Sequence, residues 1–197
     1  MIPFPNKRYS VIYADPPWSY YNDMTVSSEY ESGKCHGKGI KRPPYDVMSS
    51  KDICALPVSD IAENDSLLFL WTTDYHLRKA MEVISAWGFE YKTVGFVWQK
   101  LNKSGNPVCF MGSYTLKSGV ELCLLGTRGS NTYKMVKSHN VRSLVSQKRE
   151  EHSKKPDCVR DRIVSLVGGV PKIELFARQK CDGWDSWGNQ LDTENNL

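Results

Sequence analysis

Five short runs of apolar, β-branched and aromatic residues constrain the fold of this chain more than any other feature of its sequence. They span residues 9–15, 66–72, 93–100, 120–127 and 172–178. Runs of this length and composition predict buried strands. Between the second and third runs, apolar residues recur at helical spacing from Leu77 to Trp87, with Asp74 as the expected N-cap and Gly88 as the expected end. The pattern therefore predicts a β-α-β unit.

A second amphipathic helix is expected near the C-terminus, from Val159 to Val167, after Pro156 and before Gly168. Strands that alternate with helices predict an α/β fold with a mostly parallel sheet covered by helices. The 197 residues contain no repeat or linker, so we expect a single domain over residues 1–197. Residues 19–45, 101–119 and 129–154 have no periodicity. Loops of this length are usually functional or disordered.

The sequence favours a cytoplasmic protein without a membrane segment. No apolar run reaches the roughly 18 residues that a membrane span needs, and the start "MIPFPNKRYS" lacks the apolar region of a secretory signal. The six cysteines are scattered and form no Cys-x-x-Cys, so free thiols are expected. Cys35 beside His36 has no second pair at ligand spacing. We therefore expect no metal site.

Positive charge is concentrated in two of the long loops. Residues 33–45 include Lys41 and Arg42 and contain no acidic residue, whereas residues 131–155 carry seven basic residues against two acidic ones. A single basic run is as often a solvated surface as a binding site. Two such loops in one small chain of net charge +4 favour a polyanion, such as a nucleic acid, as the partner.

The sequence "DPPW", residues 15–18, directly follows the first expected strand. In an open α/β sheet, ligands bind at the carboxyl ends of the strands, and Asp15 stands at such an end. Pro16 and Pro17 stiffen the backbone and have no N–H. We therefore expect the Asp15 carboxylate and the Pro16 carbonyl to form a rigid pair of acceptors without a competing donor. Trp18 would lie beside them, although a plain turn with a packed tryptophan is the alternative.

Two acceptors beside an aromatic ring suit a planar molecule with an amino group, such as adenine or cytosine. The amine of a base is a weak nucleophile, and accepting its hydrogens would localise its lone pair as the transition state forms. Stacking on Trp18 would contribute about 1–3 kcal/mol. Such a base must be flipped out of a duplex or supplied in a single strand. A carboxylate buried in a salt bridge, or an indole without a cleft beside it, would contradict this interpretation.

The chain resembles the adenine methyltransferases named after the seventy-kilodalton subunit of the messenger-RNA adenosine methyltransferase. The resemblance rests on "DPPW", "PYDVMSSKDI", "SLLFLWTTDYHLRKAMEVISAWGFEYKTVGFVWQK", "GVELCLLGTRG", "KKPD", "KIELFAR" and "WGNQLD", in the order of the family and over nearly the whole chain. It implies methyl transfer from S-adenosylmethionine to adenine N6. It also implies a Rossmann-like methyltransferase fold in a permuted order, with the catalytic motif N-terminal and the cofactor elements C-terminal. That order explains why the chain has no Gly-x-Gly-x-x-Gly.

The resemblance implies roles for individual residues. Asp15, Pro16, Pro17 and Trp18 form the catalytic set, and Asp15 also borders the cofactor. The implied cofactor residues are Lys155 at the methionyl end, Arg178, Asn189 and Gln190 at the ribose, and Glu174 nearby. Outside the family context, Lys155 and Arg178 would be interpreted as surface cations, and Glu174 as a partner of Arg178.

The chain departs from the family at two places. Lys180 and Cys181 occupy the stretch where a histidine and an asparagine follow the arginine of "KIELFxR". The family also has an acidic residue well upstream of the catalytic motif that helps to hold the cofactor adenine. None of the fourteen residues before Asp15 is acidic.

The candidate substrate-binding residues lie in the first long loop. They are Tyr20, Tyr21, Lys41, Arg42 and Tyr45. The resemblance implies that Tyr45 helps to close the catalytic pocket. Tyr20 and Tyr21 either stack on a flanking base or pack on the domain. Trp71, Trp87 and Trp98 fit core positions, whereas the patterns do not decide between core and site for Trp184 and Trp187.

Compact members of the family occur in bacteria and phages, where the resemblance implies that the substrate is adenine in DNA. The alternatives are methylation of adenosine in RNA and a non-catalytic nucleic-acid-binding partner subunit. Methylation of a protein amide is disfavoured by Asp15 and by the two basic loops. Either a monomer or a homodimer is compatible with the sequence.

Overall fold

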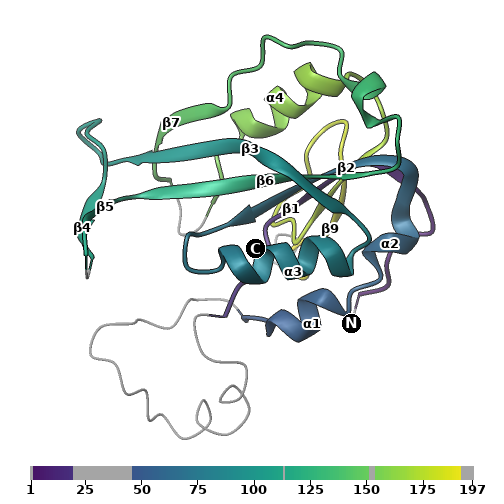
Figure 1. The fold of residues 1–197 in the computed structure, drawn as a ribbon, viewed down its shortest axis with the longest axis horizontal. Helices are drawn as coiled ribbons and strands as arrows, with labels where there is room; N and C mark the ends of the chain where they lie inside the picture. The colour runs from purple at the N-terminus through teal and green to yellow at the C-terminus, as the bar shows by residue number, and fades with distance from the viewer. Residues whose placement is uncertain (1, 20–45, 113, 151–153, 192–197) are drawn as a thin grey trace, which may run out of the picture.

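The computed structural model describes residues 2–19, 46–112, 114–150 and 154–191, and within them a seven-stranded sheet in the order β7-β3-β6-β2-β1-β8-β9 (Figure 1). The strands are β1 (Tyr9–Ala14), β2 (Ala62–Thr72), β3 (Glu90–Leu101), β6 (Val120–Arg128), β7 (Leu144–Lys148), β8 (Lys172–Leu175) and β9 (Asp185–Trp187). All of these strands run in one direction except β6, which is antiparallel to both of its neighbours. The predicted α/β fold with a mostly parallel sheet is confirmed.

Helices cover both faces of this sheet. The helices α1 (Ser50–Cys54), α2 (Val58–Ile61) and α3 (Leu77–Ala86) lie on one face, and α4 (Cys158–Val167) lies on the other (Figure 1). This three-layer arrangement agrees with a Rossmann-like methyltransferase fold. No helix in the described residues is long and apolar enough to cross a membrane. The permuted order and the single domain stay predictions.

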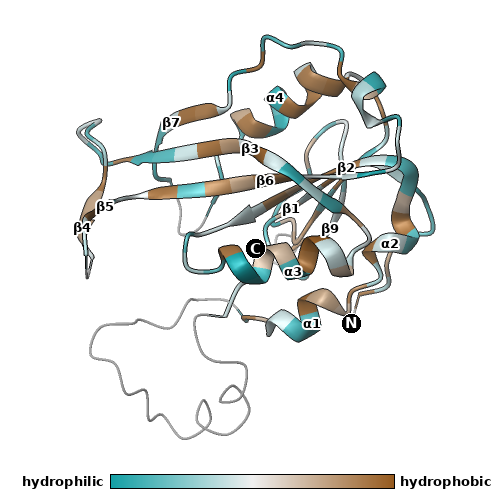
Figure 2. Ribbon diagram, viewed as in Figure 1, coloured by the Kyte–Doolittle hydropathy of each residue, from teal (hydrophilic) through white to brown (hydrophobic). Residues whose placement is uncertain are grey.

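The strands are apolar on both faces because each face is buried. In β1, Ile12 and Ala14 pack into the cluster with α1, α2 and α3, whereas Val11 and Tyr13 pack into the cluster with α4. Apolar residues therefore dominate the middle of the central strands (Figure 2), as expected of a sheet covered on two sides. The predicted core positions of Trp71, Trp87 and Trp98 are confirmed, because each is at most 3% exposed.

The β-α-β unit is present as β2, α3 and β3, but its two strands are not neighbours, because β6 lies between them. Gly88 ends α3 with a φ of 79°, as predicted. The prediction that Asp74 caps α3 is wrong. The N-cap is His76, which makes no side-chain capping hydrogen bond, whereas the Asp74 carboxylate accepts hydrogen bonds from the Tyr75 N–H and the Lys117 amine.

Two segments without periodicity contain regular structure, whereas residues 20–45 of the other lie outside the described residues. Residues 101–119 include a short antiparallel hairpin of β4 (Cys109–Met111) and β5 (Leu116–Ser118). Residues 129–154 include the 3-10 helix η1 (Thr132–Met135) and the edge strand β7. Strands of three to five residues that are mostly exposed carry too little apolar periodicity to be recognised in the sequence.

Candidate active site

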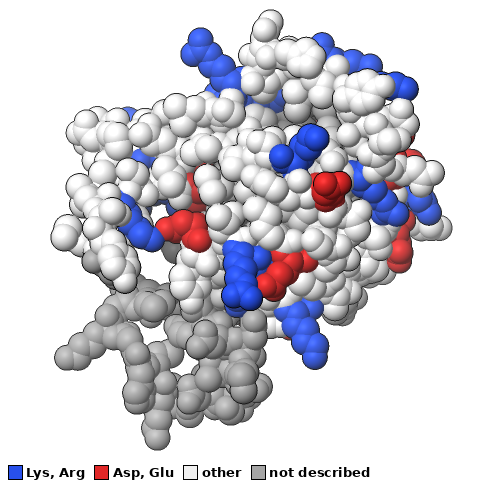
Figure 3. Space-filling view, viewed as in Figure 1, with Lys and Arg blue, Asp and Glu red and all other residues white. Residues whose placement is uncertain are grey.

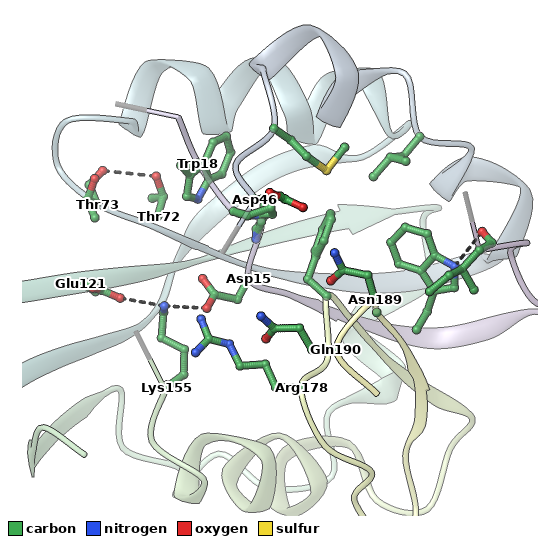
Figure 4. A pocket seen from close by; sticks show the side chains of 18 residues that line it. Asp15, Trp18, Asp46, Thr72, Thr73, Glu121, Lys155, Arg178, Asn189 and Gln190 are labelled. Atoms are coloured by element: carbon green, nitrogen blue, oxygen red, sulfur yellow. Dashed lines mark hydrogen bonds and ion pairs between the residues drawn. The ribbon is translucent and has the colours of Figure 1, made fainter. Parts of the chain in front are cut away.

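A cavity of about 360 Å³ opens at the edge of the sheet where the parallel strands end (Figure 4). Asp15 follows β1, Thr72 ends β2, Arg178 follows β8, and Gln190 follows β9. Parallel strands bring their carboxyl ends to one edge, so segments far apart in the sequence contribute to one site. The cavity falls within the range of about 300–1,000 Å³ that is usual for small-molecule pockets.

All four residues of the "DPPW" motif line this cavity, but the carbonyls of the two prolines accept hydrogen bonds within the protein. The Trp18 N–H donates to the Pro16 carbonyl at 2.8 Å, and the Met48 N–H donates to the Pro17 carbonyl at 2.9 Å. The expectation that no donor competes for the Pro16 carbonyl is therefore wrong. A carbonyl oxygen has two lone pairs, so a second hydrogen bond to Pro16 stays open to a substrate.

The Asp15 carboxylate is not open in the way that the sequence predicted. Its Oδ2 lies 2.7 Å from Lys155 Nζ, and the same ammonium lies 3.1 Å from Glu121 Oε2. Glu121 also pairs with Lys100. Asp15 keeps 25% of its side chain exposed and borders the cavity, so the salt bridge does not remove it from the site. The result is a row of alternating charges at the cavity wall (Figure 4).

Burial and the nearest opposite charges shift the pKa values of Asp15, Glu121 and Lys155 in opposite directions. Burial raises the pKa of Asp15, and the positive charge of Lys155 offsets part of that rise, while the neighbouring Glu121 adds to it. Burial also disfavours the charged form of Glu121, but Lys155 and Lys100 outweigh it and hold the pKa of Glu121 below its usual value. The pKa of Lys155 is raised, because Asp15 and Glu121 outweigh its desolvation.

Glu121 is a site residue that the sequence did not reveal. It is the second residue of β6 and would lie at the far edge of a fully parallel sheet. Because β6 runs antiparallel to β2 and β3, its first residues instead lie where the other strands end. Glu121 therefore reaches the cavity and Lys155.

Five of the six residues proposed to border the cofactor line the cavity: Asp15, Lys155, Arg178, Asn189 and Gln190. Glu174 is not among the lining residues. Its carboxylate accepts two hydrogen bonds from Arg160, at 2.9 and 3.1 Å, rather than pairing with Arg178.

The turn that carries the last cofactor candidates packs closely on the segment after β8. Phe176 has a φ of 60°, in the left-handed region. A Cβ on Gly188 would lie 2.2 Å from the Ala177 carbonyl oxygen, so only glycine fits there. Trp187, 9% exposed, packs edge-on against Phe176 and also lines the cavity. Trp184 is buried in the core on the α4 side.

The five predicted substrate-binding residues, Tyr20, Tyr21, Lys41, Arg42 and Tyr45, lie outside the described residues. The second basic loop lies largely within them. Its exposed cations are Lys134, Lys137, Arg142, Lys148 and Arg149. Lysine and arginine side chains follow the upper edge of the molecule, over α4 and the segment between β6 and β7 (Figure 3). Lys154 pairs with Glu150 and Asp157.

Trp18 is held in a fixed orientation, with 8% of its surface exposed. Its Nε1–H donates to the Trp71 carbonyl at 3.0 Å. The buried His76 ring stacks on it with a centroid distance of 5.5 Å and an interplanar angle of 18°. In the neutral ring, Nε2–H of His76 donates to the Ser19 carbonyl at 2.9 Å and Nδ1 accepts from the Thr73 hydroxyl at 3.0 Å. His76 therefore fixes the orientation of the Trp18 indole and also holds the backbone after Trp18 through the Ser19 carbonyl.

Replacing His76 by glutamine is expected to lower the rate of the site's reaction by about 2- to 10-fold, because a ring pair contributes about 0.5–1.5 kcal/mol. Glutamine keeps a donor for the Ser19 carbonyl but loses the stack. Initial rates at saturating cofactor test this, with thermal unfolding as the control for folding. A rate equal to that of the wild type would mean that Trp18 does not need the ring for its orientation.

Similarity to known proteins extends over nearly the whole of this fold. The MT-A70 family model matches residues 9–190, which include every residue that lines the cavity except Ile2. The chain belongs to the MT-A70 family. This confirms the family expected from the "DPPW" motif and its companions.

Three methyltransferases that resemble this chain differ in how much of their own length it covers. The chain is 38% identical over 200 residues to the type II methyltransferase M.MunI of a Mycoplasma species, covering 95% of this chain and 79% of that protein. It is 29% identical to the Drosophila melanogaster N(6)-adenosine-methyltransferase MT-A70-like protein, covering 94% of this chain but 27% of the relative. It is 28% identical to the human N(6)-adenine-specific methyltransferase METTL4, covering 94% and 38%. The chain thus spans less than half of these two longer relatives.

Proposed function

We propose that this chain transfers a methyl group from S-adenosylmethionine to the N6 amine of adenine in DNA. One observation carries the proposal: Asp15 and Trp18 line the same cavity as Lys155, Arg178, Asn189 and Gln190. An acceptor and an aromatic ring for a base therefore adjoin the cations and amides suited to a charged cofactor.

The cavity fits S-adenosylmethionine by the chemistry of its lining. Lys155 provides a positive charge that suits the carboxylate of a methionyl moiety, whereas Arg178, Asn189 and Gln190 provide polar groups that suit the ribose hydroxyls. The cavity wall also contains apolar residues, namely Ile2, Met48, Leu56, Phe176 and Trp187. These residues suit the adenosyl ring system. Bound there, the cofactor would supply an activated methyl group on a sulfonium.

The chain's own residues prepare the amine. The Asp15 carboxylate, with the Pro16 carbonyl, would accept the hydrogens of the adenine amine and localise its lone pair, an interaction that strengthens as the N–C bond forms. The nitrogen gains the methyl as the sulfur–carbon bond breaks. The resulting ammonium is acidic and loses its proton afterwards, so no strong base has to act before the attack. Positioning supplies most of the rate.

Lys155 holds Oδ2 of Asp15, and Glu121 makes it easier for that oxygen as well to turn to the amine. A buried ammonium without a partner is costly. Lys155 is shared between two carboxylates, at 2.7 and 3.1 Å, so it keeps Glu121 when Asp15 turns to the amine.

DNA is favoured over RNA by the similarity to M.MunI, which has the highest identity of the relatives described here and covers most of both chains. The Drosophila relative, which is named as an adenosine methyltransferase, is matched over 27% of its length. The test is to incubate the protein with methyl-labelled S-adenosylmethionine and equal amounts of adenine-containing DNA duplex, DNA single strand and RNA. We expect N6-methyladenine in DNA. Label in RNA alone would overturn the DNA substrate, and label in none would overturn methyl transfer.

A non-catalytic partner subunit is the remaining alternative, and cofactor binding separates it from an enzyme. Calorimetry with S-adenosylmethionine is expected to show binding, and its absence would favour the scaffold role. Sequencing the genomic DNA of cells that express the protein would then reveal the methylated adenines and their neighbours.

A further inference from the structure

The β4–β5 hairpin exposes large apolar side chains beside the site. The exposed fractions are 52% for Phe110, 85% for Met111, 99% for Tyr114 and 65% for Leu116. Between Leu101 and Val120 the sequence has two lysines and no acidic residue. No carboxylate of the hairpin would therefore repel a phosphate backbone.

An ion pair ties this hairpin to the rim of the cavity. Lys117 Nζ lies 2.5 Å from Asp74 Oδ2. Asp74 directly follows Thr72 and Thr73, which line the cavity. Phe110 is paired with Lys117 across the hairpin, and residues directly opposite each other project from the same face. Phe110 therefore lies on the hairpin face that is turned toward the rim.

A column of aromatic rings connects the rim to the cavity. Tyr75, whose exposed fraction is 61%, contacts His76 edge-on at a centroid distance of 4.8 Å and an angle of 83°. His76 in turn stacks on Trp18, which lines the cavity. Tyr75 is thus two ring contacts away from the proposed position of the target base.

We propose that Tyr75 and Phe110 form a stacking platform for the nucleotides that flank the target adenine in a single nucleic-acid strand. The proposal rests on the function proposed above. Adjacent nucleotides are joined by a single phosphodiester linkage, so the neighbours of a base held at Trp18 lie near this rim. Exposed rings bind bases of any sequence through their faces. The platform holds the strand, while the cavity holds the adenine.

The experiment compares Tyr75→Ala and Phe110→Ala with Tyr75→Phe and Tyr91→Ala. Tyr75→Phe keeps the ring. Tyr91 is an exposed aromatic residue at the start of β3, the end of the strand away from the cavity. The probe is a fluorescein-labelled nine-nucleotide DNA strand with one central adenine, and its dissociation constant is measured by anisotropy. Binding of S-adenosylmethionine and thermal unfolding are measured on the same proteins.

Each alanine variant of the platform is expected to raise the dissociation constant for the strand by about 5- to 100-fold, with unchanged cofactor binding and unfolding temperature. Tyr75→Phe and Tyr91→Ala are expected to match the wild type. Wild-type binding in both platform variants would overturn the proposal while leaving methyl transfer standing. Sedimentation of the same variants reports their oligomeric state. If an alanine variant changes its oligomeric state but binds the strand as the wild type does, the proposal is overturned in favour of a protein interface. If the wild type neither binds the strand nor methylates it, the proposed function itself fails.

Discussion

Replacing Asp15 by asparagine is expected to reduce methyl transfer by at least about 10²- to 10³-fold, the loss typical of removing one group that stabilises a transition state. Asparagine preserves the shape of the side chain and one carbonyl oxygen, but it removes the charge that makes a strong acceptor for the amine. Asp15→Ala should abolish the reaction, because the Pro16 carbonyl is then the one acceptor left for the two hydrogens of the amine. Transfer of label from methyl-labelled cofactor into adenine is the measurement.

The control for Asp15→Asn is cofactor binding. Lys155 keeps its second partner, Glu121 at 3.1 Å, so calorimetry should still detect S-adenosylmethionine, and the unfolding temperature should stay close to that of the wild type. A variant that binds cofactor but transfers no methyl places Asp15 in the chemical step. Retained transfer at more than a tenth of the wild-type rate would remove Asp15 from it.

The strands and most of the site could be predicted because they depend on local features. The five apolar runs form β1, β2, β3, β6 and β8, since burial on both faces leaves a continuous apolar run. Asp15, Lys155 and Arg178 were identified through family motifs, and each lines the cavity. Glu174 lies in such a motif as well, yet it pairs with Arg160 instead.

The direction of β6 could not be predicted, and this is why Glu121 was missed. An apolar run has the same composition whichever way its strand runs, and only the pairing with β2 and β3 sets the direction. A signal was nevertheless present. Glu121 is the only charged residue in the run 120–127, and a charge at a buried position is almost always paired.

His76 and the hairpin were missed for different reasons. The stack of His76 on Trp18 joins residues 58 positions apart in the sequence, which no local pattern reveals. The hairpin strands have three residues each and are exposed, so they lack the apolar alternation that marks a strand. Features that depend on tertiary pairing, rather than on burial, are the ones that the sequence conceals.

Replacing Glu121 by glutamine is expected to lower kcat for methyl transfer by about 10- to 100-fold, with a smaller effect on cofactor binding. In the wild type, Lys155 divides its charge between Asp15 and Glu121. With glutamine at position 121, Lys155 loses one of these two carboxylate partners. It therefore binds the other, Asp15, more tightly. The adenine amine must then compete with a charge-assisted hydrogen bond of about 1.5–3 kcal/mol.

The pH profile separates this positioning role from a loss of folding. The acid limb of the profile reflects protonation of Asp15. Burial raises the pKa of Asp15, and the negative charge of Glu121 raises it further. Removing that charge lowers the pKa of Asp15, so the acid limb of Glu121→Gln moves to lower pH even though kcat falls. A variant that had merely lost stability would instead weaken at both ends of the pH range. An acid limb that stays in place or moves to higher pH would mean that Glu121 does not act on Asp15 through Lys155.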